Sequence, residues 1–157
     1  MRHSVLIVSL TICACVPTKA FAQSSDKAKT FDVSPLMPRD KPFFVKADDH
    51  WEATYRAKSR SIVIQIIGVK EGDAKLLLLQ TTLGSREDVP LSRNLAVKLL
   101  ELNGHWDFAK VVLYSKFLAL RVDYPFDGLD AAAVETMCSR LAASADAALE
   151  EIKNFLP

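Results

Sequence analysis

Hydrophobic and polar residues alternate along much of the chain, and a period of two is typical of β-strands that bury one face. Alternation at 51–58 predicts a half-buried strand, and the nearly continuous β-branched run at 61–69 predicts a central one. Residues 75–83 are predicted to form a third strand that runs back along the second. The turn between them contains Gly72, which is free to adopt a positive φ. These three stretches predict an antiparallel meander.

The pattern is clearest at 99–129, where a helix end, two strands and the start of a second helix follow one another. Apolar residues occupy alternate positions in 108–114 and again in 118–124, with Ser115-Lys116 between them. Such a short link predicts a β-hairpin. Pro125 ends the second strand, because proline has no N–H to donate to a neighbouring strand.

A helix is predicted over 90–102, because leucines recur there at spacings of three and four residues. The stripe consists of Leu91, Leu95, Leu99 and Leu102. Asp88 or Ser92 is expected to cap its N-terminus. Asn103 and Gly104 are expected to end it, since both residues tolerate the left-handed conformation of many helix C-termini.

A longer helix is predicted from residue 131 towards the C-terminus, with Asp130 as its N-cap after a turn at Asp127-Gly128. One apolar stripe runs along it: Val134, Met137, Cys138, Leu141, Ala145, Ala148, Leu149, Ile152 and Phe155. The opposite face is charged, which is typical of a helix that packs on a core. The predicted fold is therefore α+β: an antiparallel sheet in βββ-α-ββ-α order, with the long C-terminal helix packed on it.

Residues 1–22 are predicted to form a secretory signal peptide. Arg2 and His3 provide a short positive segment, an apolar run follows at 5–16, and small residues precede an expected cleavage site after Ala22. The protein is therefore expected to be periplasmic or secreted.

Two alternatives to simple cleavage exist. A membrane anchor is disfavoured, because a span needs roughly 20 continuous apolar residues and this run first meets Pro17 and Lys19. Lipidation of Cys15 is the other, since the residues before it loosely resemble a lipobox, although Cys13 is unusual in that motif. After cleavage no integral membrane segment is expected.

The segment 23–44 is expected to be a linker or arm ahead of the domain at 45–157. Residues 23–30 are polar, which is typical of a flexible tether. Residues 31–44 are apolar but interrupted by prolines, which exclude a regular helix. We expect this part to lie extended on the domain, and an exposed arm that grips a partner is the alternative.

The composition is that of one globular domain, with 157 residues of which 50% are hydrophobic and 25% charged. Loss of Arg2 and Lys19 with the leader leaves 18 basic against 19 acidic residues, a net charge of −1. This balance gives no basic surface for nucleic acid. Cys138 is the one cysteine left, so no intrachain disulfide can form, and its apolar neighbours predict buried packing.

Candidate chemistry is sparse in this sequence. His50 and His105 are the histidines left after cleavage, and an acid–base or metal pair would need both in one cleft. They fall in no ligand spacing such as HxxxH, and two histidines do not fill a zinc shell. The glycines are scattered at turns and form no phosphate-binding loop. We therefore predict no catalytic, metal-binding or cofactor-binding residue, no cofactor and no enzyme activity.

The element order and a few fixed residues resemble the YbjN family, which shares the fold of class I type III secretion chaperones. The residues that carry the resemblance are Leu99-Leu100-x-Leu102-Asn103, Ala109-Lys110-Val111, Leu118-x-Leu120-Arg121-Val122-Asp123-x-Pro125, Leu129-Asp130-Ala131 and Ala145-Asp146. The resemblance covers roughly residues 49–155 and implies a protein-binding, often dimeric fold. Two features depart from it: the proline-broken segment 31–44 replaces a leading helix, and the leader contradicts the cytoplasmic site of secretion chaperones.

The leading functional hypothesis is a non-catalytic exported module, chaperone-like or regulatory, that binds a protein or peptide partner and forms a homodimer. The partner segment would add to the sheet as a strand or dock along an apolar groove. The alternative is a periplasmic small-ligand or lipid-binding protein, with Ile62, Ile64 and Ile66 lining a cavity.

Overall fold

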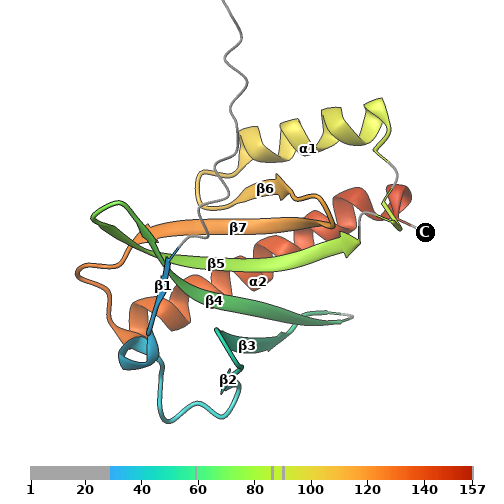
Figure 1. Cartoon of the computed structure of the whole chain (residues 1–157). Coiled ribbons are helices and arrows are strands. Elements are labelled where there is room, and N and C mark those ends of the chain that lie inside the picture. Colours follow the sequence, from blue (N-terminus) through green and yellow to red (C-terminus); the bar gives the residue numbers. More distant parts are fainter. Residues whose placement is uncertain (1–28, 59, 86, 90, 157) are drawn as a thin grey trace, which may run out of the picture.

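The computed structural model describes residues 29–156 except 59, 86 and 90. This part of the chain contains a seven-stranded antiparallel sheet and a long C-terminal helix (Figure 1), which confirms the α+β class. The predicted leader at 1–22, with Cys13 and Cys15, lies outside the described residues.

The predicted meander is present. Strands β3 (Trp51–Arg56), β4 (Ser61–Glu71) and β5 (Ala74–Ser85) pair in sequence, and Gly72 turns between the last two with a φ of 61°. Positive φ is strained for residues with a Cβ, so glycine fits this turn. The stretch predicted to return at 75–83 lies within β5.

The predicted hairpin is formed by β6 (Lys110–Leu113) and β7 (Phe117–Pro125). The strands lie in the order β2-β3-β4-β5-β7-β6, so β7 pairs with β5 and β6 is the last strand of the sheet. Consecutive strands of a hairpin are neighbours, and the longer, more buried strand takes the inner position.

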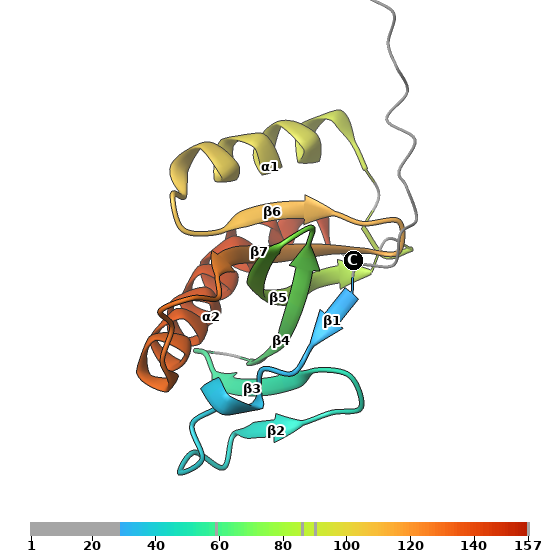
Figure 2. The same ribbon diagram turned by 60° about the vertical axis from the view of Figure 1, so that its left-hand side comes forward.

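The segment before the meander belongs to the same sheet. Strand β1 (Lys29–Phe31) pairs with the far half of β4, and β2 (Phe44–Lys46) pairs with β3 (Figure 2). Between them lies a short 3-10 helix, η1 (Ser34–Leu36). Leu36 in this helix is buried, as are Val33, Met37 and Phe44 on either side of it, so this segment lies on the domain rather than free in solvent.

One detail of the sequence prediction was wrong here. The polar tether was expected to reach Thr30, but Lys29 and Thr30 already pair with β4 as part of β1. Strands of three residues are too short to show an alternating pattern, so neither β1 nor β2 was predicted.

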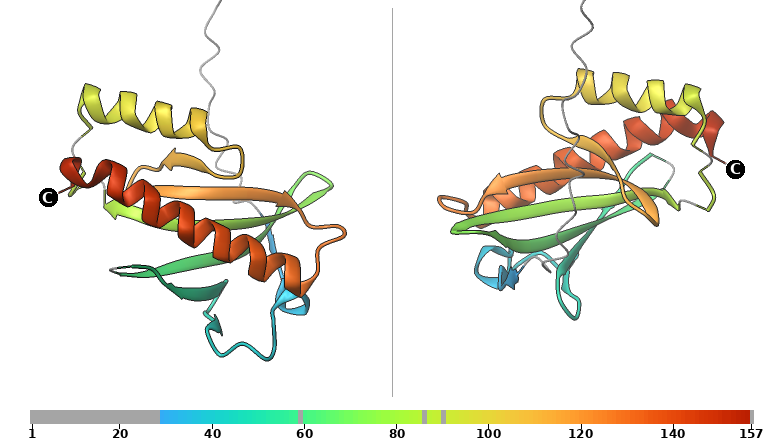
Figure 3. Two further views of the ribbon diagram at one scale, coloured as in Figure 1. Left: turned by 180° about the vertical axis from the view of Figure 1, so that it is seen from behind. Right: turned by 45° about the horizontal axis from the view of Figure 1, so that its top comes forward.

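Helix α2 (Ala131–Ile152) crosses one face of the sheet, and no helix covers the opposite face in the part of the chain that the structure describes (Figures 1 and 3). Its predicted N-cap is confirmed, because the carboxylate of Asp130 accepts a 2.7 Å hydrogen bond from the N–H of Ala133. The predicted apolar stripe is buried from Val134 to Ile152. Burial of this stripe against β4, β5 and β7 forms the core.

Helix α1 (Arg93–His105) begins three residues after the predicted start at position 90. Ser92 is the cap, as one of the two expected candidates, because its hydroxyl accepts a hydrogen bond from the N–H of Leu95 at 3.1 Å. Its predicted end was wrong, since the helix continues through Asn103 and Gly104. The reason is that the Asn103 side chain bonds to β6 and does not cap the helix. Leu91 lies before the helix, outside the buried stripe.

The pairing of β1 with β4 brings the chain close to Gly68, which lies opposite Phe31. A Cβ atom at this position would lie 2.6 Å from the carbonyl oxygen of Phe31 and 2.7 Å from Cγ1 of Val33. We expect Gly68→Ala to lower the free energy of unfolding by about 1–3 kcal/mol, as overpacking does. The measurement is the midpoint of urea unfolding.

Gly104→Ala is the matched control. A Cβ at Gly104 meets nothing within 4 Å, and the residue is helical. Alanine favours the helix by about 0.5–1 kcal/mol, so this variant should be as stable as the parent or more so. Equal stability of both variants would contradict the close packing of Phe31 and Val33 against Gly68.

Candidate functional site: an apolar groove at the edge of the sheet

Strand β6 presents half of its backbone groups away from the sheet. The hairpin is closed by a 2.9 Å hydrogen bond from the N–H of Tyr114 to the carbonyl of Phe117. Because hydrogen-bonded and non-hydrogen-bonded pairs alternate in antiparallel strands, the N–H and C=O groups of Val111 and Leu113 point away from β7. Such free edges are places where another strand can pair.

The side chain of Asn103 closes this edge at one residue. Its Nδ2 donates to the carbonyl oxygen of Val111 at 3.0 Å, and its Oδ1 accepts from the N–H of the same residue. A side-chain amide has the same donor and acceptor as a peptide group, so Asn103 takes the place of a neighbouring strand. The outward backbone groups of Leu113 have no such side chain bonded to them among the described residues.

An apolar groove of about 420 Å³ lies between α1 and β6. Leu99, Val111 and Leu118 form its buried floor, and Leu91, Leu100 and Leu113 form its rim. The rim side chains are 44%, 71% and 46% exposed, respectively. Arg93 is the one charged residue in the lining.

Helix α1 is apolar on two sides, and only one of them is used in the fold. Leu95, Leu99 and Leu102 are buried in the core, whereas Leu100 projects about 100° away from Leu99 around the helix axis and is exposed. The 2.6 Å ion pair between Lys98 and Glu151 joins α1 to α2. Large apolar side chains gathered at one exposed place are typical of interaction sites.

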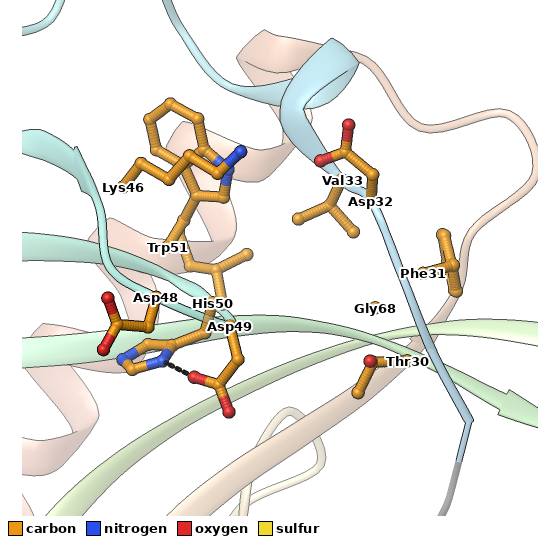
Figure 4. Close-up of a pocket in the computed structure, with 11 residues that line it drawn as sticks. Thr30, Phe31, Asp32, Val33, Lys46, Asp48, Asp49, His50, Trp51 and Gly68 are labelled. Carbon is orange, nitrogen blue, oxygen red and sulfur yellow. Dashed lines mark hydrogen bonds and ion pairs between the residues drawn. The ribbon is translucent and has the colours of Figure 1, made fainter.

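A second, polar pocket of about 260 Å³ opens where β1 and β3 meet the same edge of β4 (Figure 4). Its charged and titratable lining residues are Asp32, Lys46, Asp48, Asp49 and His50. The ring of His50 lies between two carboxylates, with Nδ1 at 2.7 Å from Asp49 and Nε2 at 3.1 Å from Glu52.

These contacts set the pKa values in the pocket. Partial burial lowers the pKa of His50, but hydrogen bonds and charge attraction from Asp49 and Glu52 outweigh it, and the net pKa is raised above 6.5. The hydrogen bond to His50 lowers the pKa of Asp49. Asp49 and Glu52 therefore favour the charged imidazolium form of His50 over the neutral form.

A row of polar side chains crosses the sheet face that lacks a helix. Glu52, Gln65, Gln80 and Arg121 are in register on four neighbouring strands. Gln80 donates to Gln65 at 2.9 Å, and Arg121 donates at 3.0 Å to the hydroxyl of Tyr114, which in turn donates to Gln80 at 3.3 Å. These side chains satisfy one another, so the row stabilises the open face.

The structure does not bring the two predicted histidine candidates together. His50 directly precedes β3, whereas His105 ends α1, the helix that packs on β6. Strands β3 and β6 are four strand spacings apart in the sheet, or roughly 19 Å. Within the described residues no group of three or more His, Cys, Asp or Glu side chains is placed to hold a metal ion. Cys138 is completely buried, and burial raises the pKa of its thiol to about 12.

The isoleucines expected to line a ligand cavity belong to the core instead. Ile64 and Ile66 are fully buried, and Ile62 is only 4% exposed, so all three side chains are part of the hydrophobic core. Their face of β4 lies under α2, which fills the space that a ligand would need.

Comparison with models of known protein families and with curated proteins finds no match for this chain. In the described residues, no helix is both long and apolar enough to cross a membrane. The geometry of the groove is therefore the basis for a functional argument.

Sequence reasoning missed the groove, although one signal for it was present. Leu100 interrupts the spacing of the leucine stripe, and an apolar residue off the stripe of an amphipathic helix needs a second partner. The exposure of Leu113 had no signal, because alternation alone does not tell which strand of a hairpin is at the edge.

The double hydrogen bond of Asn103 leads to a stability prediction. Asn103→Ala leaves a half-buried N–H and C=O of Val111 without partners, and we expect a loss of about 1–3 kcal/mol in the free energy of unfolding. Asn94→Ala, on an exposed position of the same helix, should change it by less than about 0.5 kcal/mol. Urea unfolding of both variants measures the difference, and equal losses would contradict the role of Asn103.

The carboxylates around His50 lead to a pH prediction. Because its pKa is raised on folding, charged His50 stabilises the protein below pH 6.5, and this contribution is lost as the pH rises through the folded-state pKa. The stability advantage of the parent over His50→Gln should therefore shrink between pH 6 and about pH 8. Urea unfolding across this range measures it, together with an NMR titration of the imidazole.

Glu52→Gln is the control for the cause of this shift. It removes one of the two carboxylates, so the pKa of His50 should fall towards its ordinary value. A pKa at or below 6.5 in the parent protein would contradict the described contacts.

Proposed function

We propose that this protein is a non-catalytic binding module that takes up an apolar segment of a protein partner in the groove between α1 and β6. The observation that carries the proposal is the gathering of Leu91, Leu100 and Leu113, all exposed, around one groove at the edge of the sheet. When a partner covers these side chains, each Å² of apolar surface removed from water would contribute about 25 cal/mol of favourable free energy to binding.

The backbone of β6 favours groove docking over addition of a long strand. Asn103 already occupies the outward groups of Val111, so an incoming strand can pair only from Leu113 towards the hairpin turn. Affinity would then come mainly from side chains in the groove, and the short stretch of backbone pairing would fix the direction of the bound segment.

The lining indicates the chemistry of the partner. An apolar floor and rim select a segment with hydrophobic residues at several positions, and Arg93 favours an acidic residue beside them. A homodimer, in which a second copy of the chain is the partner, is part of this proposal.

The resemblance to the YbjN family and to class I secretion chaperones supports a protein-binding role, since these folds bind other proteins. The leader expected at residues 1–22 favours a partner met in the periplasm or outside the cell, where secretion chaperones do not act. Binding of an exported protein or peptide fits both features.

The groove makes a direct prediction for binding. A library of displayed peptides selected on the purified protein should yield sequences with several apolar residues and an acidic flank. Leu100→Glu should weaken their binding about tenfold or more, because a carboxylate at the rim must be desolvated when the groove is filled. Fluorescence polarisation with a labelled selected peptide measures the affinities.

Val45→Glu is the matched control, because Val45 is 58% exposed on β2, at the far side of the sheet. This variant should bind the peptide with the parent affinity, and both variants should keep the parent unfolding midpoint. Peptides that bind Leu100→Glu as tightly as the parent would contradict the proposed site.

A further inference from the structure

A separate trough of about 450 Å³ lies beside α2 and shares no residue with the groove at α1. Ala133, Met137 and Arg140 line it from one side of α2, at a spacing of three and four residues. From Ala133 to Arg140 this wall extends about 10 Å along the helix. Phe108 and Tyr124 line it from the sheet side.

The trough is apolar along most of its length and charged at one end. Leu129, Ala133, Met137 and Phe108 supply apolar surface, and Arg140 is the one cation in the lining. A volume of this size matches the range of small-molecule pockets, which are mostly apolar with a few placed polar groups.

Arg140 is held in place without a carboxylate partner. Its guanidinium carbon lies 4.2 Å from the centroid of the Phe108 ring, so the two groups stack. No ion pair joins Arg140 to an acidic residue within the part of the chain that is described. Stacking uses the face of the guanidinium and leaves its N–H edge free to donate to an anion.

Asp107 restricts which anion fits. Asp107 also lines the trough, next in sequence to the stacked Phe108, and its negative charge disfavours a highly charged anion. A group with one negative charge that accepts two parallel hydrogen bonds from Arg140 fits this balance better than a dianionic phosphate.

We infer that this trough binds a single amphipathic monocarboxylate, such as a free fatty acid of medium length. The carboxylate accepts hydrogen bonds from Arg140, and the aliphatic chain lies along Met137, Ala133 and Leu129. This inference does not depend on the groove between α1 and β6, and either site can exist without the other.

The test is isothermal titration of the purified protein with dodecanoate below its micelle concentration, with dodecylamine as the cationic analogue. Arg140→Gln should weaken dodecanoate binding about tenfold or more, and Arg140→Lys should restore part of it. Asp107→Asn should strengthen it. Ala133→Phe fills the trough and should abolish binding while the unfolding midpoint stays near that of the parent.

Arg56→Gln, an exposed arginine on β3, is the charge-matched control and should bind dodecanoate as the parent does. Saturable binding with this pattern of variants supports the inference. No saturable binding, equal effects of Arg140→Gln and Arg56→Gln, or a preference for dodecylamine would each overturn it. Sedimentation with phosphatidylglycerol vesicles, without binding of monomeric dodecanoate, would also overturn it, because the contact would then be with a membrane surface.

Discussion

The fold depends on one constraint: every backbone group at the end of the sheet must find a partner or face solvent. Helix α2 buries one face of the sheet, but burial of a face does nothing for the free edge of β6. The chain meets this constraint with a side chain, because the amide of Asn103 bonds to both outward groups of Val111. These two hydrogen bonds join α1 to the edge strand of the sheet.

The position of α1 in turn creates the proposed binding site. Leu95 and Leu99 pack into the core while Asn103 holds the C-terminal half of the helix against β6. With the helix fixed in this orientation, Leu100 faces outward, and Leu113 lies beyond the reach of Asn103. The same contact that closes the edge at one residue therefore leaves an apolar groove and a short stretch of open backbone beside it.

The elements with strong local signals were predictable from the sequence. The meander, the hairpin and α2 follow from alternation, turn residues and the Asp130 cap, all of which act over a few residues. The short strand β1 was not predictable, because it is defined by its pairing with β4 and not by its own pattern. The groove could not be predicted for a similar reason. Asn103 has the sequence features of a helix end, and its role becomes visible only through its hydrogen bond to Val111 in β6.

The most direct test of this account is native-state hydrogen exchange at the two outward amides of β6. The account predicts slow exchange for the N–H of Val111, which Asn103 protects, and fast exchange for that of Leu113 in the free protein. Addition of a peptide that binds the groove should then protect Leu113 selectively. Equal exchange at both amides in the free protein, or no change at Leu113 on binding, would contradict the claim that the edge is closed at one residue and used at the next.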